Sequence, residues 1–317
     1  MSIDFTGRTV IVTGAGGGLG RAYALDIARR GGNVVVNDLG GNVAGDGGTS
    51  EMADKVVDEI RAAGGNAVAN YASVATAEGG QAIARTALDS FGRIDALINN
   101  AGNLRNFWFD EFSDADRDSV MATHLLGTWN VTKAVWPHMK QAGYGRIVFT
   151  ASAVAAFGNQ TQSAYGAAKG GIIGLMNVLA QEGLPHNILC NGLLPNADSR
   201  MGSEMKPEEM APVFPHIMKI GPDTIVPAYV VAPVVYMASE ACTTTHDLYS
   251  VMGRRVARAF VGVTEGWINP APAPATAEDI AANIETIRDQ TRGVHIPASL
   301  IDEFRIVGEQ FEALRET

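Results

Sequence analysis

Residues 13–20, with the sequence TGAGGGLG, lie between a short apolar run and a segment with helical spacing. The run at 8–13 (RTVIVT) is apolar and β-branched, which predicts a buried strand. From residue 18 the apolar side chains recur at helical intervals. A glycine-rich turn at a helix N-terminus presents backbone amides to an anion such as a pyrophosphate. The stretch therefore predicts a dinucleotide-binding turn, whose contacts we expect to be Gly14, Gly18, Leu19 and Gly20.

The rest of the chain continues this alternation of strand and helix. Short apolar strands are expected at 33–37, around 68, and at 94–98, 146–150 and 188–194, with helices such as 50–63 between them. Buried strands separated by helices predict a parallel sheet covered on both faces. With right-handed crossovers this is a doubly wound, Rossmann-type α/β fold.

Two segments interrupt the pattern. Residues 39–49 hold five glycines and are expected to form a mobile surface loop. The sequence NPAPAPAT from residue 269 is typical of a stiff, extended spacer. We therefore expect a domain at 1–268 and a helical extension at 269–317, with Thr276 and Ser299 capping its two amphipathic helices. These helices are expected to pack on the parent domain or on a sister subunit.

Composition excludes several classes of protein. The 317 residues carry a net charge of −10 and are 46% hydrophobic, which rules out a disordered chain and disfavours nucleic acid as the main partner. Two cysteines, Cys190 and Cys242, form no disulfide framework. No membrane span or signal peptide is expected, because long apolar runs and a charged leader pattern are missing. We expect a cytoplasmic location with reduced thiols.

Asp38 indicates which cofactor is bound. It ends the second expected strand, eighteen residues after Gly20, near the spacing of a ribose-binding carboxylate. Such a carboxylate accepts hydrogen bonds from ribose hydroxyls and repels a 2′-phosphate, which predicts NAD over NADP. The alternative is a solvated loop carboxylate.

Tyr165 and Lys169 lie four residues apart at the start of an apolar helix, so they share a face. An ammonium close to a phenol lowers its pKa, and a phenol tuned in this way can exchange a proton with an alcohol or ketone. Ser152, at the end of the strand before, can hold the reacting oxygen. By itself, the Tyr-x-x-x-Lys pattern is more often an ordinary solvated helix face.

Together these motifs resemble the short-chain dehydrogenase/reductase family. The matching residues are TGxxxGxG at 13–20, NNAG at 99–102, Ser152 and YxxxK at 165–169, and the resemblance covers about residues 5–267. It implies a Rossmann-type domain, a nicotinamide cofactor and a homodimer or homotetramer. It also implies that Tyr165 is the acid/base, that Lys169 lowers its pKa and holds the nicotinamide ribose, and that Ser152 positions the substrate oxygen.

Other positions depart from the family pattern. His124 replaces an asparagine that works through its backbone carbonyl, which holds a water joined to the lysine; a histidine still supplies that carbonyl. Ser73 and Val74 replace an Asp-Val pair at the adenine edge, and Ser199 is expected to reach the nicotinamide amide. By resemblance, Asn100 lies by the adenosine ribose, and Ala101 is expected among the cofactor contacts.

These departures resemble one branch of the family. It comprises the (3R)-hydroxyacyl-CoA dehydrogenase domains of peroxisomal multifunctional enzymes, also described as 17β-hydroxysteroid dehydrogenases, and bacterial enzymes that degrade sterol side chains as CoA thioesters. The resemblance implies NAD-dependent oxidation of a 3-hydroxyacyl-CoA to the 3-ketoacyl-CoA. Arg254, Arg255 and Arg258 are candidate contacts for CoA phosphates, although a solvated turn is the commoner meaning of such a cluster.

Two other functions stay open. A carbonyl reductase or steroid dehydrogenase would use the same residues on free alcohols, and a non-catalytic NAD-sensing module would keep only the fold. A hydrolase is disfavoured because Ser152 lies in no Gly-x-Ser-x-Gly turn. Neither a His-Glu-x-x-His motif nor clustered cysteines and histidines suggest a metal site.

Overall fold

A computed structural model describes residues 2–42, 44–197 and 213–316. The chain divides into two compact units, Met1–Arg258 and Ala259–Thr317. The first unit ends before the proline-rich stretch at which the sequence predicts a boundary, and the division at 268 stays a prediction.

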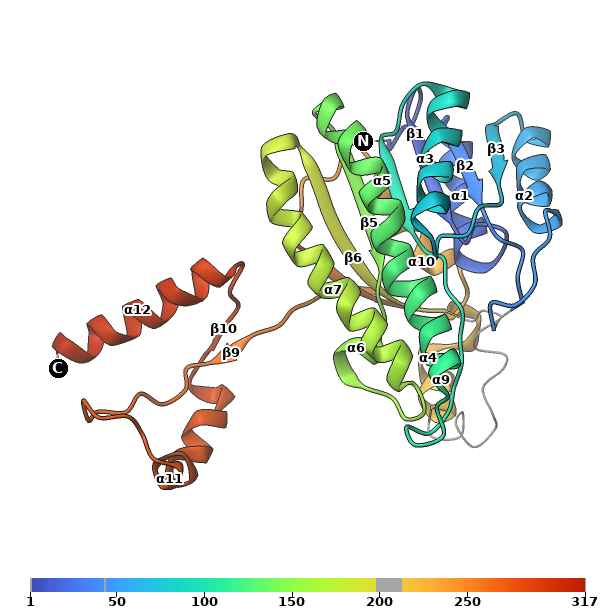
Figure 1. Cartoon of the computed structure of the whole chain (residues 1–317). Coiled ribbons are helices and arrows are strands. Elements are labelled where there is room, and N and C mark those ends of the chain that lie inside the picture. The colour runs from blue at the N-terminus through green and yellow to red at the C-terminus, as the bar shows by residue number, and fades with distance from the viewer. Residues whose placement is uncertain (1, 43, 198–212, 317) are drawn as a thin grey trace. The chain divides into compact units, whose positions relative to one another are not determined.

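A central sheet of eight strands organises the first unit, in the order β3-β2-β1-β4-β5-β6-β7-β8. Figure 1 labels β3, β2, β1, β5 and β6 of this sheet. The bounds are β1 Thr9–Thr13, β2 Asn33–Asn37, β3 Asn66–Asn70, β4 Ala96–Asn99, β5 Gly145–Thr150, β6 Ile188–Asn196, β7 Leu248–Met252 and β8 Arg255–Ala259. All pairs from β3 to β7 are parallel. The chain winds outward from β1 in both directions, which confirms the doubly wound, Rossmann-type fold and places a crevice at the carboxyl ends of β1 and β4.

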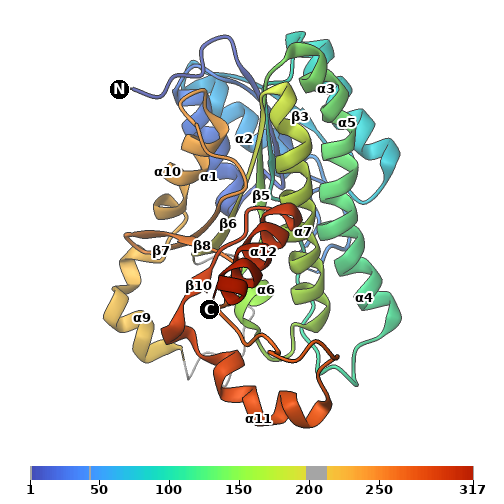
Figure 2. The same ribbon diagram turned by 90° about the vertical axis from the view of Figure 1, so that its left-hand side faces the viewer.

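Helices cover both faces of this sheet. Figures 1 and 2 show α1 (Gly18–Arg29), α2 (Glu51–Ala62) and α10 (Ala228–Ala238) on one face. The other face carries α3 (Ala77–Phe91), α5 (Gly127–Ala142) and α7 (Ser163–Gly183). Shorter elements are α4 (Asp114–Met121), the π-helix η1 (Ala122–Leu126), α6 (Ala153–Phe157), η2 (Leu184–His186), α9 (Phe214–Ile220) and η4 (Pro222–Thr224).

The core lies between the sheet and these helices. Val10, Val12 and Ile98 of the central strands are fully buried together with Tyr23 and Ile27 of α1. Because both faces are covered, the strands are continuously apolar rather than alternating, as expected for a parallel sheet. This rigid layer fixes the strand ends from which the loops of the candidate site emerge.

The second unit contains α11 (Ala277–Arg288), η5 (Gln290–Arg292), α12 (Leu300–Glu316) and an antiparallel pair, β9 (Val263–Thr264) with β10 (Val294–His295). Both predicted caps are confirmed. The Thr276 hydroxyl accepts a hydrogen bond from the Asp279 amide at 3.2 Å, and the Ser299 hydroxyl accepts one from the Asp302 amide at 3.1 Å.

Within the described part of the chain, no single helix has the length and hydropathy to cross a membrane. One bent pair, Phe214–Ile220 with Pro222–Ala238, meets the criteria by length and composition alone, with a bend of 77°.

Candidate active site

The glycine turn joins β1 to α1 and opens into a large cavity. A Cβ on Gly14 would lie 2.7 Å from the Ala101 Cα, and one on Gly20 would lie 2.2 Å from the Gly14 carbonyl oxygen, so packing requires both glycines. Gly18 has a φ of +52°, and a Cβ there would meet no atom of the described residues within 4 Å. Gly17 and Gly18 line the cavity, and the first turn of α1 has no side-chain cap. This open, uncapped helix start fits a dinucleotide pyrophosphate.

The predicted cofactor residues from β4 brace this turn. The Asn100 side-chain amide donates to the carbonyl oxygens of Thr13 and Gly14, at 3.0 and 3.1 Å. The backbone amides of Asn100 and Ala101 both donate to the Thr13 hydroxyl. Asn100 and Ala101 line the cavity, as do Leu19, Ser73 and Val74, whereas Gly20 lies behind the turn and Ser199 lies outside the described residues.

Asp38 follows β2 and faces the glycine turn. Its carboxylate accepts hydrogen bonds from the backbone amides of Gly16 at 2.8 Å and Gly40 at 2.7 Å. A Cβ on Gly16 would lie 2.8 Å from an Asp38 oxygen, so a glycine is needed for this approach. The carboxylate is therefore held beside the turn at the cavity wall.

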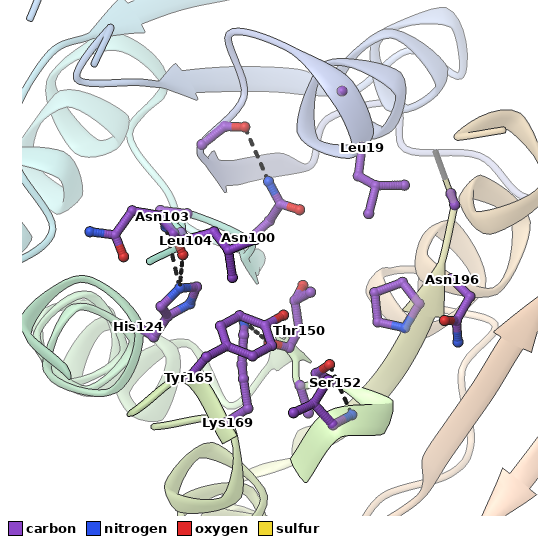
Figure 3. A pocket seen from close by; sticks show the side chains of 18 of the residues that line it. Leu19, Asn100, Asn103, Leu104, His124, Thr150, Ser152, Tyr165, Lys169 and Asn196 are labelled. Atoms are coloured by element: carbon purple, nitrogen blue, oxygen red, sulfur yellow. Dashed lines mark hydrogen bonds between the residues drawn. The ribbon is translucent and has the colours of Figure 1, made fainter. Parts of the chain in front are cut away.

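Ser152, Tyr165 and Lys169 meet in the middle of the same cavity, which has a volume of about 910 Å³ (Figure 3). Ser152 caps α6 and accepts a hydrogen bond from the Val154 amide at 3.2 Å. Tyr165 and Lys169 come from the first turns of α7, one turn apart. The Lys169 ammonium lies 5.7 Å from the Tyr165 ring centre. The fold thus brings together three residues that the sequence places on two different elements.

The charge balance at Tyr165 differs from the sequence-based expectation. Burial raises the pKa of Tyr165, and a hydrogen bond with Ser152 acts in the opposite direction. The Lys169 ammonium donates to the Thr150 carbonyl oxygen at 2.5 Å, and burial lowers the pKa of this lysine to about 7. In this structure the lysine is therefore directed to β5, and burial outweighs the lowering of the phenol pKa expected from it.

His124 contributes its ring as well as its backbone. It lies in η1 and is 1% exposed, with its imidazole edge-to-face on Tyr165 at a centroid distance of 5.1 Å. Its Nε2 lies 2.7 Å from the Asn103 carbonyl oxygen and 3.2 Å from the Asn103 backbone nitrogen, while the buried Nδ1 has no hydrogen-bond partner among the described residues. Burial and the nearby Lys169 cation lower the pKa of His124 to about 3, so the ring is neutral.

Comparisons with known proteins agree with this geometry. Residues 8–209 match the family model described as short chain dehydrogenase. The chain belongs to the short-chain dehydrogenase family. The dehydrogenase is 46% identical over 288 residues to the mouse peroxisomal multifunctional enzyme type 2, covering 90% of this chain and 37% of that enzyme. It thus spans little more than a third of the mouse protein.

Two further relatives cover more of their own length. A putative short-chain type dehydrogenase/reductase of Mycobacterium tuberculosis is 43% identical, with 89% of this chain and 94% of that protein covered. The solved structure of a 7α-hydroxysteroid dehydrogenase, complexed with NADH and 7-oxo glycochenodeoxycholic acid, has a TM-score of 0.70 and 26% identity. It covers 79% of this chain and 94% of that chain. The dehydrogenase is accordingly an oxidoreductase that uses a nicotinamide dinucleotide.

Sequence reasoning missed three residues that shape the site of this dehydrogenase. Thr150 receives the Lys169 ammonium, Asn103 orients His124, and Gly102 makes room for the imidazole, since a Cβ there would lie 2.4 Å from the His124 Cε1. Only the motif NNAG at 99–102 hinted at Gly102. The other two act through backbone carbonyls, which carry no side-chain signal.

Proposed function

We propose that this enzyme oxidises the 3-hydroxyl of a 3-hydroxyacyl-CoA to the 3-ketoacyl-CoA with NAD, and that thioesters of sterol side chains are among its substrates. The observation that carries the proposal is the position of Ser152, Tyr165 and Lys169 in one cavity. In the sheet order, Ser152 follows β5 and lies between the glycine turn after β1 and the apolar Met252 at the end of β7. The similarity to peroxisomal multifunctional enzymes supports the thioester class.

In the proposed mechanism, the substrate hydroxyl is held between Ser152 and the Tyr165 hydroxyl, and Tyr165 takes its proton. When bound, the nicotinamide supplies the hydride acceptor. Lys169 would hold the nicotinamide ribose, and His124 packs edge-to-face against the Tyr165 ring. Because burial raises the pKa of Tyr165, the phenolate that accepts this proton becomes more populated as the pH rises, so oxidation is favoured at higher pH.

The preference for NAD rests on Asp38. Its carboxylate is held at the cavity wall beside the glycine turn, where it accepts from ribose hydroxyls and repels a 2′-phosphate. Among the described residues that line the cavity there is no arginine, and the lysine there, Lys169, lies at the catalytic centre. No cation therefore offsets the repulsion within the described lining.

The far end of the cavity suits an apolar substrate. Its described lining consists mainly of apolar side chains from α9, η4 and their surroundings: Val213, Phe214, Ile217, Ile220, Ile225, Val226 and Met252. Burying apolar substrate groups here contributes about 25 cal/mol per Å² of area removed from water. This lining supports an acyl chain or a sterol side chain rather than a small polar alcohol.

An assay of cofactor reduction on three matched substrates tests the proposal. These are a short (3R)-hydroxyacyl-CoA, a hydroxylated sterol-side-chain CoA thioester and a free 17β-hydroxysteroid, each with NAD and with NADP. We expect the thioesters with NAD to give the highest kcat/KM. If only the free steroid reacts, the enzyme is a steroid dehydrogenase instead, a function that the apolar lining and the structural similarity to a hydroxysteroid dehydrogenase also favour.

A cytoplasmic homodimer or homotetramer, with a helical extension from residue 269, remains part of the proposal. It rests on the family resemblance, on the composition and on the proline-rich spacer.

A further inference from the structure

A short basic turn joins β7 to β8 beside the apolar end of the active-site cavity. Arg254 and Arg255 of this turn border a second cavity of about 410 Å³, whose other lining residues are Ile220, Ser250 and Met252. Ile220 and Met252 also line the large cavity. The two cavities therefore share a wall, and in the sheet order the turn between β7 and β8 is separated from β1 and its glycine turn by β4, β5 and β6.

The position of the turn is fixed by packing. Gly253 has a φ of +56°, and a Cβ there would lie 2.9 Å from the Thr224 hydroxyl and 3.0 Å from the Ile220 side chain. Close contact with α9 and η4 therefore needs a glycine at this position. Because Ile217 and Ile220 of α9 line the large cavity, the arginine turn is attached to the same element that bounds the substrate region.

The charges of these two arginines are not neutralised within the described part of the chain. Arg258 forms an ion pair with Asp247 at 2.7 Å, whereas no ion pair there involves Arg254 or Arg255. Arg255 makes one long contact with the Ser250 hydroxyl, at 3.4 Å. Both arginines are exposed in a chain of net charge −10. Adjacent guanidinium groups beside a cavity fit phosphate oxygens, which they bind with paired hydrogen bonds.

We propose that Arg254 and Arg255 bind the phosphate groups of the nucleotide part of the CoA thioester. The acyl end then lies at Tyr165, and the uncharged pantetheine arm passes the wall formed by Ile220 and Met252. This inference rests on the proposed function and adds an anion subsite to it. If the two arginines were only part of a solvated turn, the enzyme would show no preference for a thioester that carries phosphate groups.

Two substrates with the same reacting group separate an effect on phosphate binding from an effect on the chemical step. The assay compares kcat and KM for a 3-hydroxyacyl-CoA and for the N-acetylcysteamine thioester of the same acid, which has the same reacting group and no phosphate. In the variant R254Q/R255Q we expect KM for the CoA thioester to rise about tenfold, equivalent to about 1.4 kcal/mol, with kcat unchanged. Both constants for the N-acetylcysteamine thioester should stay as in the wild type.

Three controls sharpen this test. R254K/R255K keeps the charge and should restore part of the KM, and R85Q removes an exposed arginine from α3 and should change nothing. Added salt should raise the wild-type KM for the CoA thioester more than that of the double glutamine variant, because exposed ion pairs are screened. Thermal melting checks that each variant is folded.

The outcomes distinguish the two proposals. If R254Q/R255Q loses kcat/KM equally on both thioesters, or if its KM for the CoA thioester is unchanged, the anion subsite is overturned and the dehydrogenase function is left intact. If the wild type oxidises neither thioester, the proposed function fails and the subsite fails with it.

Discussion

Replacing Lys169 with methionine should stabilise the fold while it abolishes the activity. The lysine is 3% exposed, and burial lowers its pKa from 10.5 to about 7. At about 1.36 kcal/mol per pKa unit, that difference corresponds to about 5 kcal/mol of unfavourable free energy for the buried ammonium. Methionine has a similar shape and carries no charge, so the variant avoids this cost.

One favourable contact is lost in the variant. The Lys169 ammonium donates to the Thr150 carbonyl oxygen at 2.5 Å, and methionine cannot replace that hydrogen bond. Leaving a buried acceptor without its donor costs about 1–3 kcal/mol. We therefore expect Lys169→Met to raise the free energy of unfolding by about 2–4 kcal/mol at pH 6, where the native lysine carries its full charge.

The gain depends on pH in a defined direction. Between about pH 7 and pH 10.5 the unfolded chain binds a proton that the folded chain does not, so the stability of the native protein rises with pH. The free-energy cost of burying the Lys169 ammonium is complete below pH 7 and falls toward zero as the pH approaches 10.5. The advantage of the variant should therefore be largest at pH 6 and should disappear near pH 10.

Urea unfolding of the cofactor-free protein at pH 6, 8 and 10 measures these differences, with Lys133→Met on the exposed side of α5 as the matched control. The control should change stability by less than about 0.5 kcal/mol at every pH. If Lys169→Met is no more stable than the native protein at pH 6, or if its advantage does not shrink with rising pH, the buried ammonium is not a source of instability. Loss of turnover in the same variant would identify a residue kept for function at the expense of stability.

Three other substitutions test the remaining parts of the site. Tyr165→Phe should lower kcat by about 10²–10⁴-fold with unchanged cofactor affinity in a fluorescence titration, because the ring packing remains and only the oxygen proposed as acid/base is lost; a drop below tenfold would assign the proton transfer elsewhere. Gly102→Ala places a methyl group 2.4 Å from the His124 Cε1 and should lower the stability of the fold by about 1–3 kcal/mol in melting experiments. Adding His124→Ala should relieve this clash and recover the stability lost to it, whereas an unchanged melting temperature for Gly102→Ala contradicts this packing. Asp38→Ser removes the carboxylate beside the glycine turn and should shift the ratio of kcat/KM for NAD over NADP toward NADP by about tenfold or more, whereas a constant ratio would refute its role in selecting NAD.

Local patterns in the sequence were enough for the fold and for much of the site. The run at 8–13, the glycine turn and the helical spacing that follows it predict β1 and α1 because strand and helix periodicity depend on near neighbours. The same holds for the caps Thr276 and Ser299. Tyr165 and Lys169 could be paired from their four-residue spacing, and both line one cavity with Ser152.

Only the tertiary structure decided how those residues are charged and what surrounds them. The imidazole of His124 meets Tyr165 because η1 packs against α7, and Gly102 from the end of β4 leaves it the space. Lys169 is directed to Thr150 by the packing of α7 on β5, and its lowered pKa follows from that burial. The basic turn at Arg254 lies beside Ile220 of α9, at a cavity that no local pattern predicts. Burial and cross-chain distance depend on elements far apart in sequence, so no local pattern contains them.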